Sequence, residues 1–157
     1  YKENSLAYLP EECRSIEDVA EKERCIDVYA ASQPCWELPQ GSERISCLRK
    51  ILFLGDINDE KNKCFNDPSR NKCFFDFKNK VYAMIKFRFY DLEERAEDAL
   101  EDGRAGFEDV VDVVTKLEIK KQEFNKVKTK EERKKIILEV REIWKNFEVK
   151  IKGEDNE

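Results

Sequence analysis

The sequence contains no histidine at all. Histidine is the commonest general base in enzymes, and its absence excludes the serine–histidine–aspartate and cysteine–histidine arrangements of nucleophilic catalysis. The glycine-rich motifs that cradle phosphates are also missing. Acidic residues are abundant, but they lie in runs that are typical of solvated helix surfaces. We therefore expect no catalytic residues, no bound metal, no cofactor and no enzymatic activity.

Glycine and proline are scarce as well, with 5 and 4 in 157 residues. Strand-rich folds need frequent turns, whereas a few long helices need few. With 40% hydrophobic residues the chain has enough apolar side chains to form a core. The composition therefore favours an all-α fold.

Long hydrophobic runs do not occur, and no segment approaches the ~18 apolar residues of a membrane-spanning helix. The net charge of -5 argues against nucleic acid as a partner, because phosphate binding depends on clustered positive charge. The chain opens on Tyr1 rather than Met, which is typical of a processed mature form or of a part of a larger protein. We expect no membrane span in this chain and no nucleic-acid partner.

Cysteine is absent from the second half of the chain, but six cysteines lie in the first half. None is part of a C-x-x-C motif, and without histidine a zinc site lacks its usual ligands. An even number of cysteines confined to one region indicates a disulfide framework and an oxidising compartment. The chain is therefore expected to be secreted or extracytoplasmic, at a cell surface or envelope, with disulfides formed by Cys13, Cys25, Cys35, Cys47, Cys64 and Cys73.

The pairing follows from the helices that surround these cysteines. Helical periodicity predicts one helix over 15–31 and a second over 42–55, joined by a loop over 32–41. In such a hairpin Cys25 and Cys47 lie at equal depth on either side of the loop, so they are expected to pair.

The remaining cysteines leave two patterns open. A polar connection over 56–71 allows a local Cys64–Cys73 closure, which would leave Cys13 to pair with Cys35 from the far end of the first helix. A rival pattern rests on the equal spacing of twelve residues from the first to the second cysteine and from the third to the fourth. It joins the first to the fourth and the second to the third, which gives Cys13–Cys47 and Cys25–Cys35.

The second half of the chain shows sustained helical periodicity. A long helix is predicted over 74–102, ended by Gly103, and a second from residue 107 to about 124. Thr129 and Glu132 form a capping box that begins a final helix. Short connections between long helices give antiparallel packing. We expect an N-terminal disulfide-bonded helical hairpin (1–73) packed on a three-helix antiparallel bundle (74–157).

Charge is segregated along this second half. Residues 91–112 hold ten acidic side chains and two arginines, and residues 116–135 hold nine lysines and arginines and four acids. One interpretation is mutual neutralisation between antiparallel neighbours, together with i,i+4 pairing within each helix. The other is a dipolar surface that docks a charged partner or a second copy of the chain. The candidate interaction residues are Glu93, Glu94, Glu97, Asp98, Lys120, Lys121 and Lys128, of which Lys121 stands where the helical pattern calls for an apolar residue.

One stretch resembles known sequences. Residues 94–145 contain Glu-Asp-Gly, Lys-Lys-Gln-Glu-Phe-Asn and Thr-Lys-Glu-Glu-Arg-Lys. In these segments the chain resembles helical regions of uncharacterised exported proteins of archaea. The resemblance covers about a third of the chain and implies an envelope or surface location with no known activity.

Together these patterns predict a non-catalytic extracytoplasmic structural or protein-interaction domain that binds through exposed charged helix faces, with a protein partner or self-association. Two alternatives stay open. The aromatic residues between Phe74 and Tyr90 form either core or the lining of a pocket for a small apolar ligand, which would make the protein a carrier. A periplasmic-chaperone-like helical clamp would instead need an apolar groove beside charged rims.

Overall fold

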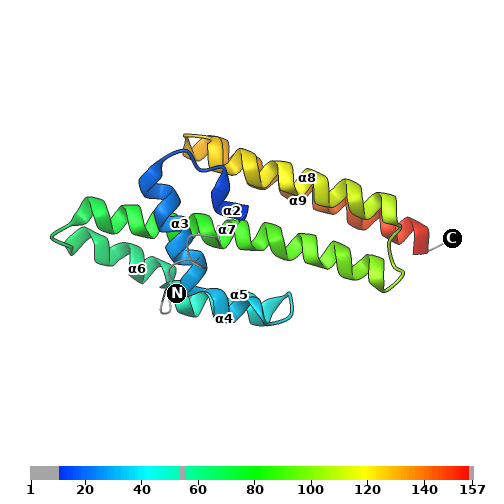
Figure 1. Ribbon diagram of the computed structural model, residues 1–157, viewed down its shortest axis with the longest axis horizontal. Coiled ribbons are helices and arrows are strands. Elements are labelled where there is room, and N and C mark those ends of the chain that lie inside the picture. The colour runs from blue at the N-terminus through cyan, green and yellow to red at the C-terminus, as the bar shows by residue number, and fades with distance from the viewer. Residues whose placement is uncertain (1–10, 54–55, 156–157) are drawn as a thin grey trace, which may run out of the picture. The chain divides into compact units, whose positions relative to one another are not determined.

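All regular elements in the computed structural model are helices, and no β-strand occurs in residues 11–53 and 56–155, which are the residues the structure describes. The expected all-α fold is confirmed. In chain order the elements are α2 (Glu11–Arg14), α3 (Val19–Ala31), α4 (Gln33–Trp36), α5 (Ser42–Phe53), α6 (Ile57–Lys63), the 3-10 helix η1 (Cys64–Asn66), α7 (Arg70–Glu101), α8 (Phe107–Lys126) and α9 (Lys130–Asp155) (Figure 1).

The chain divides into two compact units, residues 1–87 (unit 1) and 88–157 (unit 2). The division falls inside α7, which is continuous because it has neither glycine nor proline between its ends. One helix therefore contributes residues to both units, whereas the sequence pattern placed the change of character near residue 74.

Unit 1 uses the same arrangement twice: a one-turn helix, a short turn and a longer helix tied back by a disulfide. Cys13–Cys25 joins α2 to α3, and Cys35–Cys47 joins α4 to α5. Each pair is separated by 12 residues. In both, the amide three residues after the first cysteine donates to that cysteine's carbonyl, at 3.3 and 3.2 Å. The twelve-residue spacing therefore marks the bonded pairs themselves.

This pairing overturns both predicted patterns for the first four cysteines. Cys25 does not pair with Cys47, Cys13 does not pair with Cys35, and the rival pattern is also wrong. The reason is that the helix predicted over 15–31 begins only at Val19, which leaves residues 15–18 outside it. The chain turns back between α2 and α3, so the Cα atoms of Cys13 and Cys25 lie 5.8 Å apart.

The start of α3 is set by a helix cap. Asp18 has an extended backbone, and its carboxylate accepts a hydrogen bond of 2.9 Å from the amide of Glu21, so α3 begins at Val19. The predicted loop over 32–41 likewise contains α4, whose first turn accommodates Pro34 because the first helical amides need no partner within the helix. The predicted end of the second helix at Gly55 lies outside the described residues.

The third disulfide closes the loop before α7. Cys64–Cys73 was predicted as a local closure and is confirmed, with Cα atoms 5.3 Å apart. The segment over 56–71 was predicted as a polar connection, but it contains two helical elements, α6 and η1. Asp56 starts α6 by accepting a hydrogen bond of 2.7 Å from the amide of Asn58.

Three aromatic rings from three helices form the centre of unit 1. Tyr29 of α3 stacks on Phe87 of α7 with ring centroids 4.4 Å apart, and Trp36 of α4 meets both rings edge-on. Lys86, beside Phe87 in sequence, is buried and donates a hydrogen bond of 3.2 Å to the carbonyl of Glu12. The core thus ties α2, α3 and α4 to the first part of α7.

In unit 2, α8 and α9 lie side by side and run in opposite directions (Figure 1). Lys150 of α9 pairs with Asp109 near the start of α8, at 3.3 Å. Glu139, earlier in α9, pairs with Lys120 nearer the end of α8, also at 3.3 Å. Residue numbers rise along one helix as they fall along the other, which is the antiparallel arrangement expected from the short connection.

The last part of α7 packs on α8 with the same antiparallel sense. Phe89 meets Phe124 edge-on, with ring centroids 6.0 Å apart. One turn further along α7, the carboxyl group of Glu93 lies 3.0 Å from Nζ of Lys121. Three helical segments thus form an antiparallel bundle within unit 2.

Both turns of unit 2 have the predicted signals. Gly103 has a φ of +76°, and the amide of Arg104 donates to the carbonyl of Ala99 at 2.8 Å, as in a Schellman motif. The capping box is also confirmed: the amide of Glu132 donates to Thr129 Oγ1 at 3.1 Å, and the amide of Thr129 donates to Glu132 Oε1 at 3.2 Å.

Candidate interaction surface

Unit 2 has an acidic end, which consists of the last turns of α7, the α7–α8 connection and the first turns of α8. The last turn of α7 contains no basic residue. Carboxylates there meet the negative end of the helix dipole, which costs about 0.3–1 kcal/mol each. Helix stability therefore does not explain their presence. The exposed carboxylates of this acidic end are Glu97, Glu101, Asp102, Glu108 and Asp112.

The opposite, basic end consists of the end of α8, the α8–α9 connection and the first turns of α9. The side chains of its lysines make no ion pair or hydrogen bond with any residue that the structure describes. Glu132 is occupied by the capping box, and its hydrogen bonds with Thr129 hold the pKa of its carboxyl below the usual value. The exposed lysines of the basic end are Lys126, Lys128, Lys130, Lys134 and Lys135.

The two ends are too far apart to neutralise each other. Helix α8 connects them and has 20 residues, which corresponds to about 30 Å at 1.5 Å per residue. Exposed charges are screened beyond about 8 Å at physiological ionic strength. Cross-helix pairs such as Lys120–Glu139 occur along the α8–α9 seam, so the predicted neutralisation is partial and leaves both ends charged.

The structure separates the seven candidate residues into three groups. Glu97 and Lys128 are exposed, as an interaction surface requires. Lys120 is partly buried and pairs with Glu139 at 3.3 Å. Glu94 and Asp98 are also partly buried and have partners of their own.

Glu93 and Lys121 are buried and do not belong to the surface, which corrects their assignment from the charge pattern. The side chain of Lys121 is 1% exposed, and its ammonium lies 3.0 Å from Glu93 and 2.6 Å from Glu118. It also lies 5.5 Å from the centre of the Tyr90 ring. A buried charge requires partners of this kind. Lys121 interrupts the apolar stripe because it is the centre of a buried ionic cluster.

Glu93 shares this cluster with a second carboxylate. Burial is the largest influence on it and raises the pKa of Glu93 to about 8. The hydrogen bond with Glu118 raises the pKa further, and the positive charge of Lys121 opposes the rise without cancelling it. At neutral pH the carboxyl of Glu93 therefore keeps its proton.

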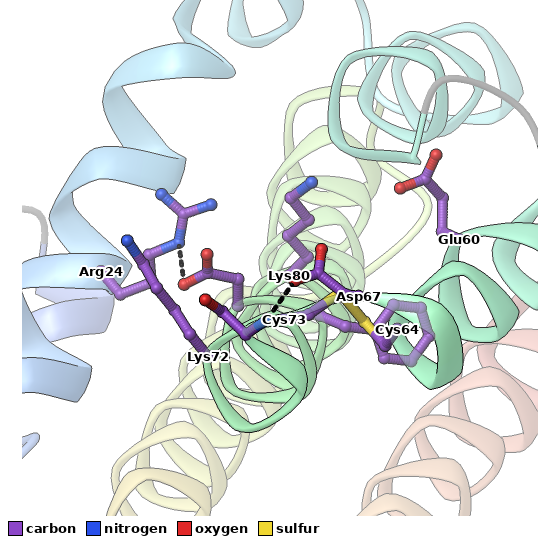
Figure 2. A pocket seen from close by; sticks show the side chains of 10 residues that line it. Arg24, Glu60, Cys64, Asp67, Lys72, Cys73 and Lys80 are labelled. Atoms are coloured by element: carbon purple, nitrogen blue, oxygen red, sulfur yellow. Dashed lines mark hydrogen bonds and ion pairs between the residues drawn. A yellow bond between two sulfur atoms is a disulfide. The ribbon is translucent and has the colours of Figure 1, made fainter.

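Unit 1 contains a pocket beside the Cys64–Cys73 disulfide, with a volume of about 230 Å³ (Figure 2). Its lining carries both signs of charge. Arg24 of α3 pairs with Asp76 of α7 at 3.3 Å, and Asp67 accepts a hydrogen bond of 2.7 Å from the amide of Ser69. Since most of its charged groups already have partners within the fold, we assign no ligand to this pocket.

Sequence patterns did not reveal the large apolar side chains that unit 2 exposes. On α8 these are Phe107, Val111 and Ile119, and on α9 they are Leu138 and Val149. A hollow of about 210 Å³ lies between the two helices, with Val113, Phe147 and Val149 in its wall. A signal was present at two of these positions: Ile119 and Leu138 each lie two residues from apolar positions of the core stripe, which places them on the opposite side of the helix.

Two kinds of site are absent from the part of the chain that the structure describes. No group of three or more histidine, cysteine, aspartate or glutamate side chains is arranged to hold a metal ion. Among the same residues, every helix is too short or too polar to cross a bilayer.

Comparison with known proteins identifies no relative. No protein-family model matches the sequence, and no curated protein and no solved structure is similar to it.

Proposed function

We propose that this chain is an exported, non-catalytic protein-interaction domain that binds charged partner surfaces through unit 2. The observation that supports this most is the pair of oppositely charged ends, which are separated by the length of α8 and do not neutralise each other. Clustered exposed charge of one sign attracts a partner of the other sign and speeds its association. The cost of acidic residues at the end of α7 favours a role in binding over a role in stability.

The export part of the proposal depends on the disulfides. All six cysteines are paired, and such bonds persist in oxidising compartments. A secreted or envelope location would also place the charged ends where they meet other extracytoplasmic proteins.

The alternatives have less support. A carrier for a small apolar ligand would need a cavity among the aromatic residues, but Tyr29, Trp36 and Phe87 pack directly on one another. A chaperone-like clamp would need an apolar groove with charged rims. The hollow between α8 and α9 has that character, but at about 210 Å³ it is small for an unfolded client.

A binding experiment tests the proposal. The full chain is immobilised and incubated with the extracytoplasmic fraction of its source cells, and bound proteins are eluted with increasing salt. We expect a defined partner that elutes as salt screens the charges. Binding should be lost in the Lys128→Glu/Lys130→Glu variant and kept in Lys128→Arg/Lys130→Arg.

A matched control distinguishes a surface from total charge. Lys50→Glu/Lys61→Glu makes the same change in net charge at two exposed positions of unit 1. This variant should bind as the wild type does. The proposal would be contradicted if both glutamate double variants lost binding equally. It would also be contradicted if the wild type and all three variants captured the same proteins.

A further inference from the structure

The outer face of the α8–α9 pair carries two apolar side chains at its middle. Ile119 of α8 and Leu138 of α9 are 52% and 54% exposed. Along each helix the residues two positions before and two positions after are buried, so both side chains point away from the core. These buried neighbours are Leu117, Lys121, Ile136 and Val140.

The two side chains lie on the same face. Two antiparallel helices are related by a local two-fold axis that runs perpendicular to both, and the Lys120–Glu139 pair at 3.3 Å places this axis at the level of positions 120 and 139. The rotation that exchanges position 120 with position 139 also exchanges position 119 with position 138, and it leaves exchanged residues on the same face of the helix pair. The buried residues follow the same correspondence, and α7 packs on the side of Lys121, so this outer face is the one opposite α7.

Each helix repeats the same three-residue pattern along this face at intervals of seven residues. A seven-residue step returns a side chain to almost the same side of a helix. In both helices the first position is acidic, the middle one apolar and the last one basic. The triads are Asp112, Ile119 and Lys126 on α8, and Glu131, Leu138 and Lys145 on α9; all six residues are exposed.

We propose that this face binds a second copy of the chain, through a two-fold axis that crosses the helices at the level of Ile119 and Leu138. Such an axis places each helix antiparallel to its counterpart. Ile119 then meets its own equivalent, Asp112 faces Lys126 of the partner subunit, and Lys126 faces Asp112 of the partner subunit. The α9 triad pairs in the same way. The inference depends on the proposed interaction function and names its partner.

The charges identify a second copy as the occupant. An order of acid, apolar and base is complementary to itself only when reversed, so an antiparallel copy satisfies every position. Asp112 has an ion pair within its own helix, at 2.9 Å from Lys116. Glu131, Lys126 and Lys145 have none with the residues that the structure describes.

A charge-swap experiment tests the dimer. One variant is made acidic at both ends of the triads (Lys126→Glu/Lys145→Glu), and the other is made basic (Asp112→Lys/Glu131→Lys). The full-length proteins are studied by sedimentation velocity over a concentration series, with circular dichroism to confirm that each is folded. The wild type should dimerise. Each variant alone should dimerise at least about a hundredfold more weakly, because every cross-dimer pair becomes like-charged.

Mixing the two variants gives the decisive measurement. The acidic variant should bind the basic one as a heterodimer of near wild-type affinity, because each reversed charge then meets its opposite. A monomeric wild type, a variant that dimerises as well as the wild type, or a mixture that stays monomeric would overturn the proposal. Lys128 and Lys130 lie outside the triads, so the capture experiment described above can succeed or fail independently of this one.

Discussion

Unit 1 contains three disulfides between residues 13 and 73, whereas the described part of unit 2 contains none. The two units also differ in the lengths of their helices. The α-helices of unit 1 before α7 have between 4 and 13 residues, while α8 and α9 have 20 and 26. Helices shorter than about 12–15 residues are marginal in water. Unit 1 therefore compensates for short helices with covalent closures, and unit 2 depends on long amphipathic helices and one buried ionic cluster.

This difference predicts which interactions determine the fold of each unit. Covalent closure stabilises unit 1 mainly by restricting the unfolded chain, so its helices tolerate weak periodicity. Unit 2 has no such restriction, and we expect the Glu93–Lys121–Glu118 cluster to fix the register of α7 on α8. A buried ionic group of this kind specifies an arrangement more than it adds stability.

Reduction of the disulfides should have the largest effect and should separate the two units. Each closure contributes about 3 kcal/mol. With tris(carboxyethyl)phosphine we expect amide hydrogens of α2 to α6 to lose protection from exchange, as read by mass spectrometry, while α8 and α9 keep theirs. Equal loss of protection in α3 and α9 would show that unit 2 depends on the disulfides as well, and the comparison would fail.

Removal of the buried ammonium should be the largest single-residue effect in unit 2. Lys121→Met leaves two carboxyls without their cation, and breaking a buried ion pair costs about 3–5 kcal/mol. Lys120→Met is the matched control one position away. Its ion pairs with Glu123 and Glu139 are partly exposed and should cost about 1 kcal/mol or less. Urea unfolding measures both, and equal free energies would contradict a special role for Lys121.

The contrast between the units also explains what the sequence could predict. In unit 2 long periodic stripes, Gly103 and the Thr129–Glu132 box act locally, so the helices and both turns were predicted correctly. In unit 1 the turn between α2 and α3 depends on Asp18 as a cap and on a four-residue helix too short to show periodicity. The helix predicted over 15–31 included residues 15–18, which form that turn, and the disulfide pairing derived from it was therefore wrong.

The burial of individual charged side chains was harder to predict from the sequence than the helices that carry them. The pattern identified Lys121 as unusual, but burial depends on which helix lies opposite, and periodicity within one helix does not contain that information. Glu93 was assigned to the surface for the same reason. The outer triads of α8 and α9 became visible only when the Lys120–Glu139 pair aligned the two helices.

The protonated carboxyl of the cluster should make unit 2 sensitive to pH. The pKa of Glu93 is about 8 in the folded protein, against an ordinary 4.5, so the folded state binds the proton more tightly than the unfolded state. The associated stability is complete below the ordinary pKa and is lost as pH rises through about 8. Glutamine mimics the protonated form, so Glu93→Gln should flatten this dependence.

Urea unfolding at about pH 5 and about pH 9 measures the pH dependence of the free energy of unfolding. The wild type should lose more stability between the two than Glu93→Gln does, and the difference should appear in the exchange protection of α8. Identical pH dependence in both proteins would mean that Glu93 titrates normally.

The smallest effect concerns the two helix caps, one in each unit. Thr129→Ala removes the cap of α9 and should cost about 1 kcal/mol. Asp18→Ala removes the equivalent cap of α3, which accepts a hydrogen bond of 2.9 Å from Glu21. The Cys13–Cys25 bond already closes the turn around Asp18, so its loss should cost less than that of Thr129. Unfolding under oxidising conditions compares the losses of stability in the two variants.

After reduction Asp18→Ala should cost more than Thr129→Ala, because Asp18 then holds its turn without a covalent bond. If Thr129→Ala still cost more, the disulfide and the cap would act independently.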